Sequence, residues 1–210
     1  MIELLIVDDH TIFRSGLRRM LSDEADLHVA DEAGDGSSAL AKIRSGKFDV
    51  VLMDINMAGR SGLDTLESIR AERPELPVIM LSMYPEEQYA VLALRARANA
   101  YLSKDVEPQE LLTAIRHVVG GGRYVSPRSA ANLLMQMDRA REGAPHEKLT
   151  AREMQVMMKI VRGMSLTDVG VQMCLSVKTV STYRVRILEK LGLASNAELV
   201  QYAMRNGLLD

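Results

Sequence analysis

Acidic side chains follow two of the apolar runs in this sequence. Asp8 and Asp9 follow "LLIV", and Asp54 follows "DVVLM", a run that predicts a strand covered on both faces. A buried carboxylate without compensation is costly, so in practice it pairs, binds a metal ion or takes up a proton. Carboxylates brought together repel one another and favour a cation, and an oxygen-rich set with room for water suits Mg²⁺.

Further polar residues follow the other apolar runs. Asn56 lies just after Asp54, Ser82 ends "VIMLS", and Lys104 follows "AYLS". Taken singly, each has an ordinary explanation as a helix cap, a turn residue or a solvated lysine. Taken together, they support phosphoryl transfer. Asp54 can act as a nucleophile toward phosphorus, Mg²⁺ and Lys104 can neutralise charge on the transferring oxygens, and Ser82 can donate a hydrogen bond to one of them.

Strands and helices alternate over the first part of the chain, and this alternation would position these side chains. The expected strands are "LLIV", "HVADEA", "DVVLM", "PVIML" and "AYLS". Helical patterns separate them at Ile12–Leu21, Ser37–Ser45, Gly62–Glu72, Glu86–Arg95 and Pro108–Val119. Such repeats predict an α/β domain with a five-stranded, doubly wound parallel sheet, whose ligands bind at the carboxyl ends of the strands.

Residues 1–120 resemble the receiver domain of bacterial two-component response regulators, which has a flavodoxin-like fold. The motifs that carry the resemblance are "LLIVDDH", "VVLMDINMAG", "VIMLS" and "AYLSKD". The resemblance implies that Asp54 is the phosphoacceptor and that Asp8, Asp9 and the backbone carbonyl of Asn56 serve a Mg²⁺ site. It also implies a switch formed by Ser82, Lys104 and the aromatic Tyr101, which could equally be an ordinary strand residue.

The sequence departs from the receiver pattern at two places. Ala58 stands where the family usually has Pro, which loosens the loop after Asp54 without removing a ligand. Arg97 and Asn99 stand where a Gly is usual before the last strand, so the turn there needs another explanation.

Residues 121–147 interrupt this alternation and predict a linker. A glycine run is followed by Ser-Pro, an Ala, Leu and Met-rich segment, and a Gly-Ala-Pro stop. We expect a short helix from about Pro127 to Ala140, with Met135 and Met137 packing on a neighbouring domain rather than binding a ligand.

Residues 148–210 predict an all-α domain of four helices. Thr150 and Glu153 form a capping box at the start of the first helix, and "LTDVGVQM" is separated by a short turn from "VKTVSTYRVRILEKLG". Two helices joined in this way fit a helix-turn-helix, whose second helix enters the major groove of DNA. The residues Val180, Ile187, Leu188 and Leu191 form the expected buried stripe of that helix.

This second domain resembles the LuxR-type DNA-binding domain of NarL/FixJ-type response regulators. The resemblance implies phosphate contacts by Lys178, Thr179, Tyr183, Arg184 and Arg186. It places Ser181, Thr182 and Val185 nearer the base edges. Tyr183 replaces a frequent His, and Gly170 replaces a frequent Ala. The last helix carries Leu199, Val200 and Ala203 on one side, which either pairs two DNA-binding domains or belongs to the domain core.

Composition supports this division. The net charge is −2 overall, but residues 1–120 carry 13 Lys and Arg against 20 Asp and Glu, whereas residues 121–210 carry 13 against 8. A basic second domain is consistent with a polyanionic partner. The single cysteine, Cys174, excludes an internal disulfide framework and is expected in the core. There is no basic leader and no apolar stretch of membrane-spanning length, so we expect a cytoplasmic protein without a membrane partner.

These patterns predict a transcription regulator rather than an enzyme, a phosphoacceptor that takes part in its own Mg²⁺-dependent phosphoryl transfer. A cognate histidine kinase would phosphorylate Asp54, and a homodimer, formed on phosphorylation or DNA binding, would bind double-stranded DNA, with RNA polymerase as a further partner. Phosphatases of the haloacid-dehalogenase type also use an aspartyl nucleophile, but they place a second Asp where this chain has Asn56. A third alternative is a module that binds DNA without phosphorylation.

Overall fold

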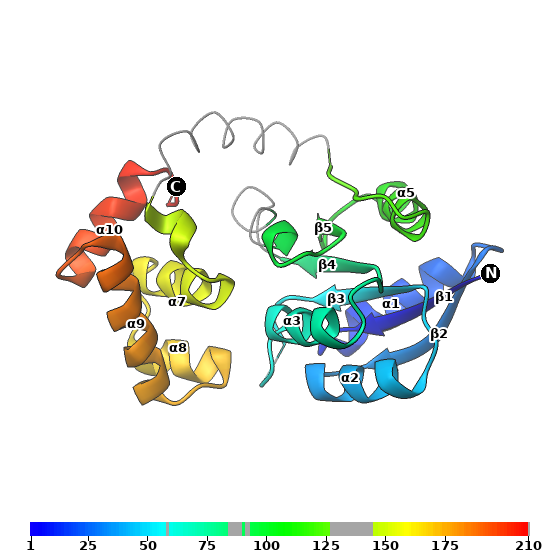
Figure 1. Ribbon diagram of the computed structural model, residues 1–210, viewed down its shortest axis with the longest axis horizontal. Coiled ribbons are helices and arrows are strands. Elements are labelled where there is room, and N and C mark those ends of the chain that lie inside the picture. The colour runs from blue at the N-terminus through cyan, green and yellow to red at the C-terminus, as the bar shows by residue number, and fades with distance from the viewer. Residues whose placement is uncertain (58, 84–89, 91–92, 127–144, 210) are drawn as a thin grey trace. The chain divides into compact units, whose positions relative to one another are not determined.

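The computed structural model describes residues 1–57, 59–83, 90, 93–126 and 145–209. The chain divides into two compact units, Met1–Leu133 and Leu134–Asp210, which are described separately (Figure 1). Within the described residues no helix has both the length and the apolar character needed to cross a membrane.

The first unit is built on a parallel sheet of five strands in the order β2-β1-β3-β4-β5. The strands are β1 (Ile2–Val7), β2 (Leu27–Ala33), β3 (Val50–Asp54), β4 (Val78–Ser82) and β5 (Ala100–Ser103). Every residue of β3 and β4 is buried, as expected for strands that have helices on both faces.

The described helices of this unit are α1 (Thr11–Ser22), α2 (Gly36–Ser45), α3 (Gly62–Glu72) and α5 (Pro108–Val119). Apolar residues of α1 and α5 share one core cluster with alternate residues of β1, β3, β4 and β5. Local signals set the starts of the other helices, because Asp35 and Ser61 accept hydrogen bonds from amides of the first turns of α2 and α3.

The second unit is helical. It contains a short 3-10 helix η1 (Pro145–Lys148), followed by α7 (Ala151–Val161), α8 (Leu166–Met173), α9 (Val177–Leu191) and α10 (Asn196–Arg205). The predicted capping box of Thr150 and Glu153 is present at α7. The predicted stripe of α9 is buried: Val180, Ile187, Leu188 and Leu191.

The predicted fold class is confirmed: a flavodoxin-like α/β domain with strand order 2-1-3-4-5 is followed by a helical domain. Most of the helix expected at 86–95, the connector helix expected at 127–140, and Ala58 lie outside the described residues. The prediction for Cys174 is wrong, because this residue is exposed. It caps α8 in the left-handed conformation, with φ 52°, at the surface turn between two helices.

The other unusual turn precedes β5. Arg97 has φ 67°, the left-handed conformation that explains why glycine is the usual residue in this region. Asn99 supports the turn with its side chain, whose Oδ1 accepts hydrogen bonds from the backbone of Val78 at 3.1 Å and from Arg70 at 2.9 Å. The turn therefore keeps its glycine-like geometry, at a cost of about 1–2 kcal/mol for the non-glycine residue.

Candidate functional site

The acidic side chains meet at one edge of the sheet. β1 and β3 are neighbours in register, with Val7 opposite Met53. The next residues along the two chains of backbone, Asp8 after Val7 and Asp54 after Met53, therefore lie side by side. Both are almost fully buried, each with 1% of its surface exposed. Asp9 is partly exposed, with 27% of its side chain accessible.

Lys104 brings a buried positive charge to these carboxylates. Its Nζ lies 2.8 Å from Asp8 Oδ2 and 2.9 Å from Asp54 Oδ2, and only 4% of its side chain is exposed. Its backbone amide donates to Ser82 O at 2.8 Å, which fixes the residue after β5 to the end of β4. The ring of Phe13, on α1, lies 4.7 Å from Nζ and adds a cation–π contact.

Burial raises the pKa of the Asp54 carboxyl above its ordinary value, and the neighbouring charge of Asp8 acts in the same direction. Lys104 opposes this shift through its charge and a hydrogen bond, and the amide of Asn56 donates to Asp54 Oδ1 at 3.2 Å. The ionised form of Asp54 is therefore incompletely compensated by the protein alone.

Ser82, Tyr101 and Asn56 lie as the sequence predicts, at the carboxyl ends of strands or within them. Ser82 is completely buried at the end of β4, in register with Ser103. Tyr101, the second residue of β5, is also buried, with 2% exposed, and it lies opposite Met80 of β4. Asn56 is partly buried, two residues after Asp54, the last residue of β3. The carboxyl edge of the sheet thus gathers the predicted receiver-site residues except Tyr101, which lies within β5.

Gly62 holds the start of α3 close against Asp54. Its amide donates to Ile55 O at 3.0 Å, and a Cβ at this position would lie 2.0 Å from the backbone oxygen of Asp54. Any other residue must therefore displace either the end of β3 or the start of α3. Helical periodicity does not predict this constraint, although a glycine at the first helical position is a visible signal.

His10 also belongs to this site, although it is not among the residues predicted from the sequence. It precedes α1 as its N-cap residue, but its side chain makes no capping hydrogen bond. Its Nδ1 instead lies 2.9 Å from Asp9 Oδ1, 3.3 Å from Asp8 Oδ1 and 3.8 Å from Asp54 Oδ2. The available signal was its place directly after the acidic pair in "DDH".

The donor atoms fit a divalent cation. One ligand atom from each of Asp8, Asp9, His10 and Asp54 lies within 4.8 Å of all the others. Asp8 Oδ2 and Asp54 Oδ2 are buried and face the Lys104 ammonium at 2.8 Å and 2.9 Å, and a carboxylate oxygen has a second lone pair beside the one turned toward an ammonium. These buried oxygens keep lone pairs for a cation, as the predicted metal site requires.

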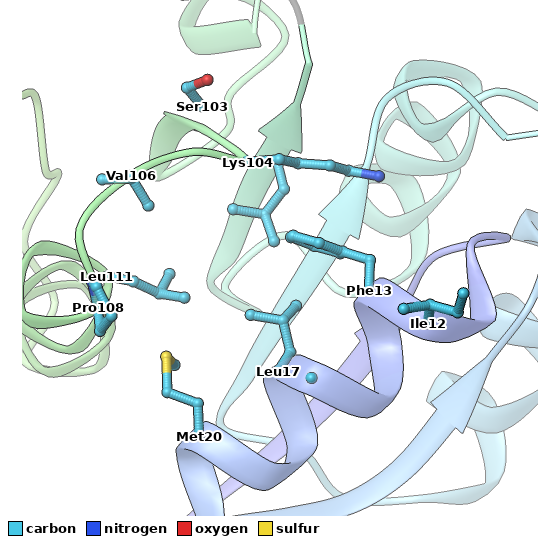
Figure 2. A pocket seen from close by; sticks show the side chains of 11 residues that line it. Ile12, Phe13, Leu17, Met20, Ser103, Lys104, Val106, Pro108 and Leu111 are labelled. Atoms are coloured by element: carbon cyan, nitrogen blue, oxygen red, sulfur yellow. The ribbon is translucent and has the colours of Figure 1, made fainter.

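An apolar cavity of about 340 Å³ lies beside this cluster, between α1 and the start of α5. Figure 2 shows Phe13, Leu17 and Met20 of α1 facing Val106 and Leu111 across it, with the Lys104 side chain extending past the Phe13 ring. The aliphatic part of Lys104 therefore borders an apolar cavity, while its ammonium lies among carboxylates.

In the second unit, α8 and α9 form the predicted helix-turn-helix. Only Cys174, Leu175 and Ser176 separate the two helices, and Ser176 caps α9 by accepting from the amide of Thr179 at 3.0 Å. A Cβ at Gly170 would lie 2.8 Å from the backbone oxygen of Leu175, so this glycine allows the turn to fold back against α8.

The exposed face of α9 contains most of the predicted DNA contacts. Seven residues line a shallow groove along it: Val177, Lys178, Ser181, Thr182, Val185, Arg186 and Glu189. Thr179 and Tyr183 are partly buried, and Thr179 Oγ1 is 2.8 Å from Ser176 Oγ. Arg184 is also partly buried, and its Nε donates to Asn196 Oδ1 at 2.6 Å, so it contacts the start of α10.

An ion pair connects α9 to α7. Lys190 Nζ lies 2.6 Å from Glu153 Oε2, the carboxylate that also accepts from the amide of Thr150 at 2.7 Å. Although burial acts in the opposite direction, the hydrogen bonds from Lys190 and Thr150 hold the pKa of Glu153 below its ordinary value. In α10, Leu199 and Ala203 are completely buried, which assigns that part of its apolar side to the domain core.

Comparison with known proteins gives matches to both units. Residues 4–116 match the family described as response regulator receiver domain, and residues 147–203 match bacterial regulatory proteins of the luxR family. The response regulator GacA of Pseudomonas protegens is 38% identical over 210 residues, covering 100% of this chain and 99% of GacA.

Two solved structures are similar over nearly the whole chain. RcsB from Salmonella enterica serovar Typhimurium, bound to the promoter rprA in the presence of the phosphomimetic BeF3−, superposes with a TM-score of 0.66 at 22% identity and covers 96% of this chain and 98% of its own. The response regulator ChrA of a heme-sensing two-component system gives a TM-score of 0.54 at 30% identity, and the match covers 99% of this chain and 98% of ChrA. The chain therefore belongs to the two-component response regulators of the NarL/FixJ type, transcription regulators that join a receiver domain to a LuxR-type DNA-binding domain.

Proposed function

We propose that Asp54 accepts a phosphoryl group from a phosphohistidine of a cognate histidine kinase, and that this modification controls DNA binding through α9. The observation that carries the proposal is the contact of 2.9 Å between the buried carboxylate of Asp54 and the ammonium of Lys104, with Asp8 on the same ammonium. An acceptor oxygen beside a fixed positive charge suits phosphoryl transfer, where catalysis consists largely of positioning and charge stabilisation.

In this step an oxygen of Asp54 attacks the phosphorus of the phosphohistidine. A P–O bond forms, the P–N bond breaks, and the departing imidazole nitrogen takes a proton from solvent. Lys104 stays beside the acceptor oxygen and offsets the charge that gathers on the transferred group. The chain is thus a phosphoacceptor that promotes its own modification rather than an enzyme that turns over.

Mg²⁺ is the proposed cofactor, because it would supply further neutralisation of the phosphoryl oxygens when bound. Asp8, Asp9 and Asp54 would hold it, with the backbone carbonyl of Asn56 as an additional ligand. The buried oxygens of Asp8 and Asp54 support this assignment. The side chain of Asn56, which replaces the acid of hydrolytic enzymes, favours a phosphoryl group that persists.

Ser82, Lys104 and Tyr101 form the proposed switch. A phosphorylated side chain adds about −1.5 to −2 charge at pH 7, judging by phosphorylated hydroxyl groups, and would draw Ser82 and Lys104 toward it. The space vacated by Ser82 would then be open to Tyr101. The complete burial of both side chains supports this coupling, because a movement of one requires repacking of its surroundings.

Most of the proposed DNA contacts lie on the exposed face of α9. Lys178, Thr179, Tyr183, Arg184 and Arg186 would contact phosphates, and Ser181, Thr182 and Val185 would lie nearer the base edges. The exposed fraction of Val185, 45%, supports an apolar contact such as one with a thymine methyl group. Two such domains in a homodimer would bind paired half-sites in the cytoplasm, with RNA polymerase as a further partner.

The experiment is phosphorylation of the full chain with acetyl phosphate in Mg²⁺, followed by mass spectrometry. Wild type and the control Asp23→Asn, which changes an exposed aspartate, should each gain one phosphoryl group, and Asp54→Asn should gain none. Undiminished labelling of Asp54→Asn would remove this residue from the role. DNA affinity that is the same with and without beryllofluoride would instead favour a module that binds DNA independently of phosphorylation.

A further inference from the structure

The His10 imidazole faces the acidic cluster instead of capping α1. His10 occupies the N-cap position of α1, where its side chain makes no capping hydrogen bond. Its backbone amide is already used, because it donates to Asp8 Oδ1 at 2.8 Å. The imidazole instead turns back over the carboxylates that precede it.

Hydrogen bonding alone does not account for the position of Nδ1. An imidazole nitrogen carries at most one hydrogen, so it serves one acceptor well. Here carboxylate oxygens of three residues lie within 3.8 Å of it, those of Asp9, Asp8 and Asp54. Lys104 already supplies a positive charge to Asp8 and Asp54 through their Oδ2 atoms. Nδ1 therefore approaches three carboxylates, two of which share the single ammonium of Lys104.

The distances do match a coordination shell. With bonds of about 2.1 Å in octahedral geometry, neighbouring ligand atoms lie about 3.0 Å apart and opposite ones about 4.2 Å apart. The distances from Nδ1, 2.9 Å, 3.3 Å and 3.8 Å, fall within or close to this range. Since 64% of the side chain is exposed, Nε2 can keep its hydrogen toward solvent. Nδ1 then has a lone pair with which to bind a metal ion.

We propose that His10 Nδ1 is a ligand of the receiver metal site, which makes it a mixed nitrogen and oxygen site that favours transition-metal ions such as Mn²⁺ and Co²⁺ over Mg²⁺. This inference rests on the proposed function, because it concerns the metal that assists phosphorylation of Asp54. Imidazole binds divalent transition metals well, and affinity at such sites rises from Mn²⁺ through Fe²⁺ to Co²⁺ and Ni²⁺. Mg²⁺ gains little from a nitrogen ligand and prefers oxygen.

The test is a metal titration of the full, unphosphorylated chain with MgCl₂, MnCl₂ and CoCl₂. The variants are His10→Phe, which removes the donor but keeps a ring, and His10→Ser, which places a favoured helix N-cap residue at the position and so protects the fold. The matched control is His28→Phe, since His28 is another exposed histidine of this unit whose Nδ1 contacts a single carboxylate, Glu3, at 2.8 Å.

Loss of an outer-shell partner typically costs 10–100-fold in metal affinity, so loss of a direct ligand should lower the preference for Co²⁺ over Mg²⁺ by at least about tenfold in both His10 variants. The control should keep the wild-type preference. Electron spin echo measurements on the Mn²⁺-loaded chain should show a directly bound ¹⁴N in wild type and His28→Phe, and none in the His10 variants.

Failure of this inference is distinguishable from failure of the proposed function. If all variants bind the three ions as wild type does, with no bound nitrogen, His10 is not a ligand, while acetyl phosphate labelling of Asp54 can remain intact. If the site binds no divalent ion, the metal-assisted phosphorylation and the role of His10 both fall.

Discussion

The receiver site and the face of α9 both depend on charged side chains, but their surroundings are opposite. Asp8, Asp54 and Lys104 are almost completely buried, and the Lys104 ammonium lies within 3 Å of an oxygen of each carboxylate. Lys178, Thr182 and Arg186 of α9 are exposed in a shallow groove. Buried charges interact strongly and tolerate little displacement, whereas exposed charges are screened by salt and remain free to reach a partner.

This difference has a consequence for each region. The receiver site holds an electrostatic conflict that a metal ion or a phosphoryl group can relieve, so its chemistry is coupled to the stability of its fold. The α9 face can lose a charge with little effect on folding. Changes in the first region should therefore be large and internal, and changes in the second should be small and dependent on salt.

The largest effect is expected for Gly62→Ala. A Cβ would lie 2.0 Å from Asp54 O, so the end of β3 or the start of α3 must move, at a cost of about 3 kcal/mol of receiver stability and with loss of most acetyl phosphate labelling. Gly16→Ala in α1 is the control, because nothing lies within 4 Å of its Cβ, and it should be neutral or stabilise by up to about 1 kcal/mol. Hydrogen exchange of peptides from β3 measures the stability of the receiver domain separately from that of the helical domain. Equal protection in the two variants would contradict the close packing.

Asp54→Asn should stabilise the metal-free receiver by an amount on the order of 1 kcal/mol at neutral pH. Since burial raises the folded-state pKa of Asp54, the cost of the ionised carboxylate is absent below its unfolded-state pKa and develops as the pH rises through the folded-state pKa. Urea unfolding at pH 4 and pH 7 should thus show a larger difference between variant and wild type at pH 7. Saturating Mg²⁺ should reduce this difference in stability at pH 7, because only wild type keeps all of the proposed metal ligands. A variant less stable at pH 7 without metal would show that Lys104 compensates Asp54 fully.

Glu153→Gln should destabilise the DNA-binding domain by about 1 kcal/mol, because the amide retains a capping contact but loses the charge opposite Lys190. The pH dependence is opposite to that of Asp54. The folded-state pKa of Glu153 is lowered, so its stabilisation is present above the unfolded-state pKa and is lost as the pH falls through the folded-state pKa. Hydrogen exchange of α7 peptides at pH 7 and at pH 4 would measure the stability of this domain in the variant and in wild type. A stability difference between them that is the same at both pH values would exclude the ion pair as its source.

The smallest effects concern the proposed phosphate contacts on α9. Lys178→Ala should weaken binding to specific and unrelated DNA alike and reduce the slope of log affinity against log salt by about 0.9. Arg184→Ala should change this slope less and cost about 0.5–1 kcal/mol of stability, since its guanidinium is hydrogen-bonded to Asn196. Lys47→Ala, an exposed lysine of the receiver domain, is the control. Equal slopes for Lys178→Ala and the control would remove Lys178 from the DNA contacts.

The elements and the main site residues were predictable because they depend on local patterns. The predicted bounds of α3, α5 and α8 agree with the structure residue for residue, since apolar periodicity and capping residues act within a few positions. The gathering of Asp8, Asp54 and Lys104 followed from topology, because the carboxyl ends of parallel strands share one edge.

The remaining features depend on tertiary distances that local patterns do not contain. His10 has no periodic signature, and its orientation is visible only once three carboxylates surround its ring. Arg184 lies off the buried stripe of α9, but its long side chain reaches the start of α10. Cys174 was expected in the core from its residue type, whereas the left-handed turn after α8 places it at the surface.

The exposed position of Cys174 gives the molecule a natural attachment point for a spectroscopic probe. It is the single cysteine of the chain, so a maleimide dye or a nitroxide would react at one place without any substitution. That place is the turn immediately before α9. A dye there would report the approach of DNA to the helix, and nitroxides on two copies would measure the separation of the recognition helices in a dimer, before and after beryllofluoride.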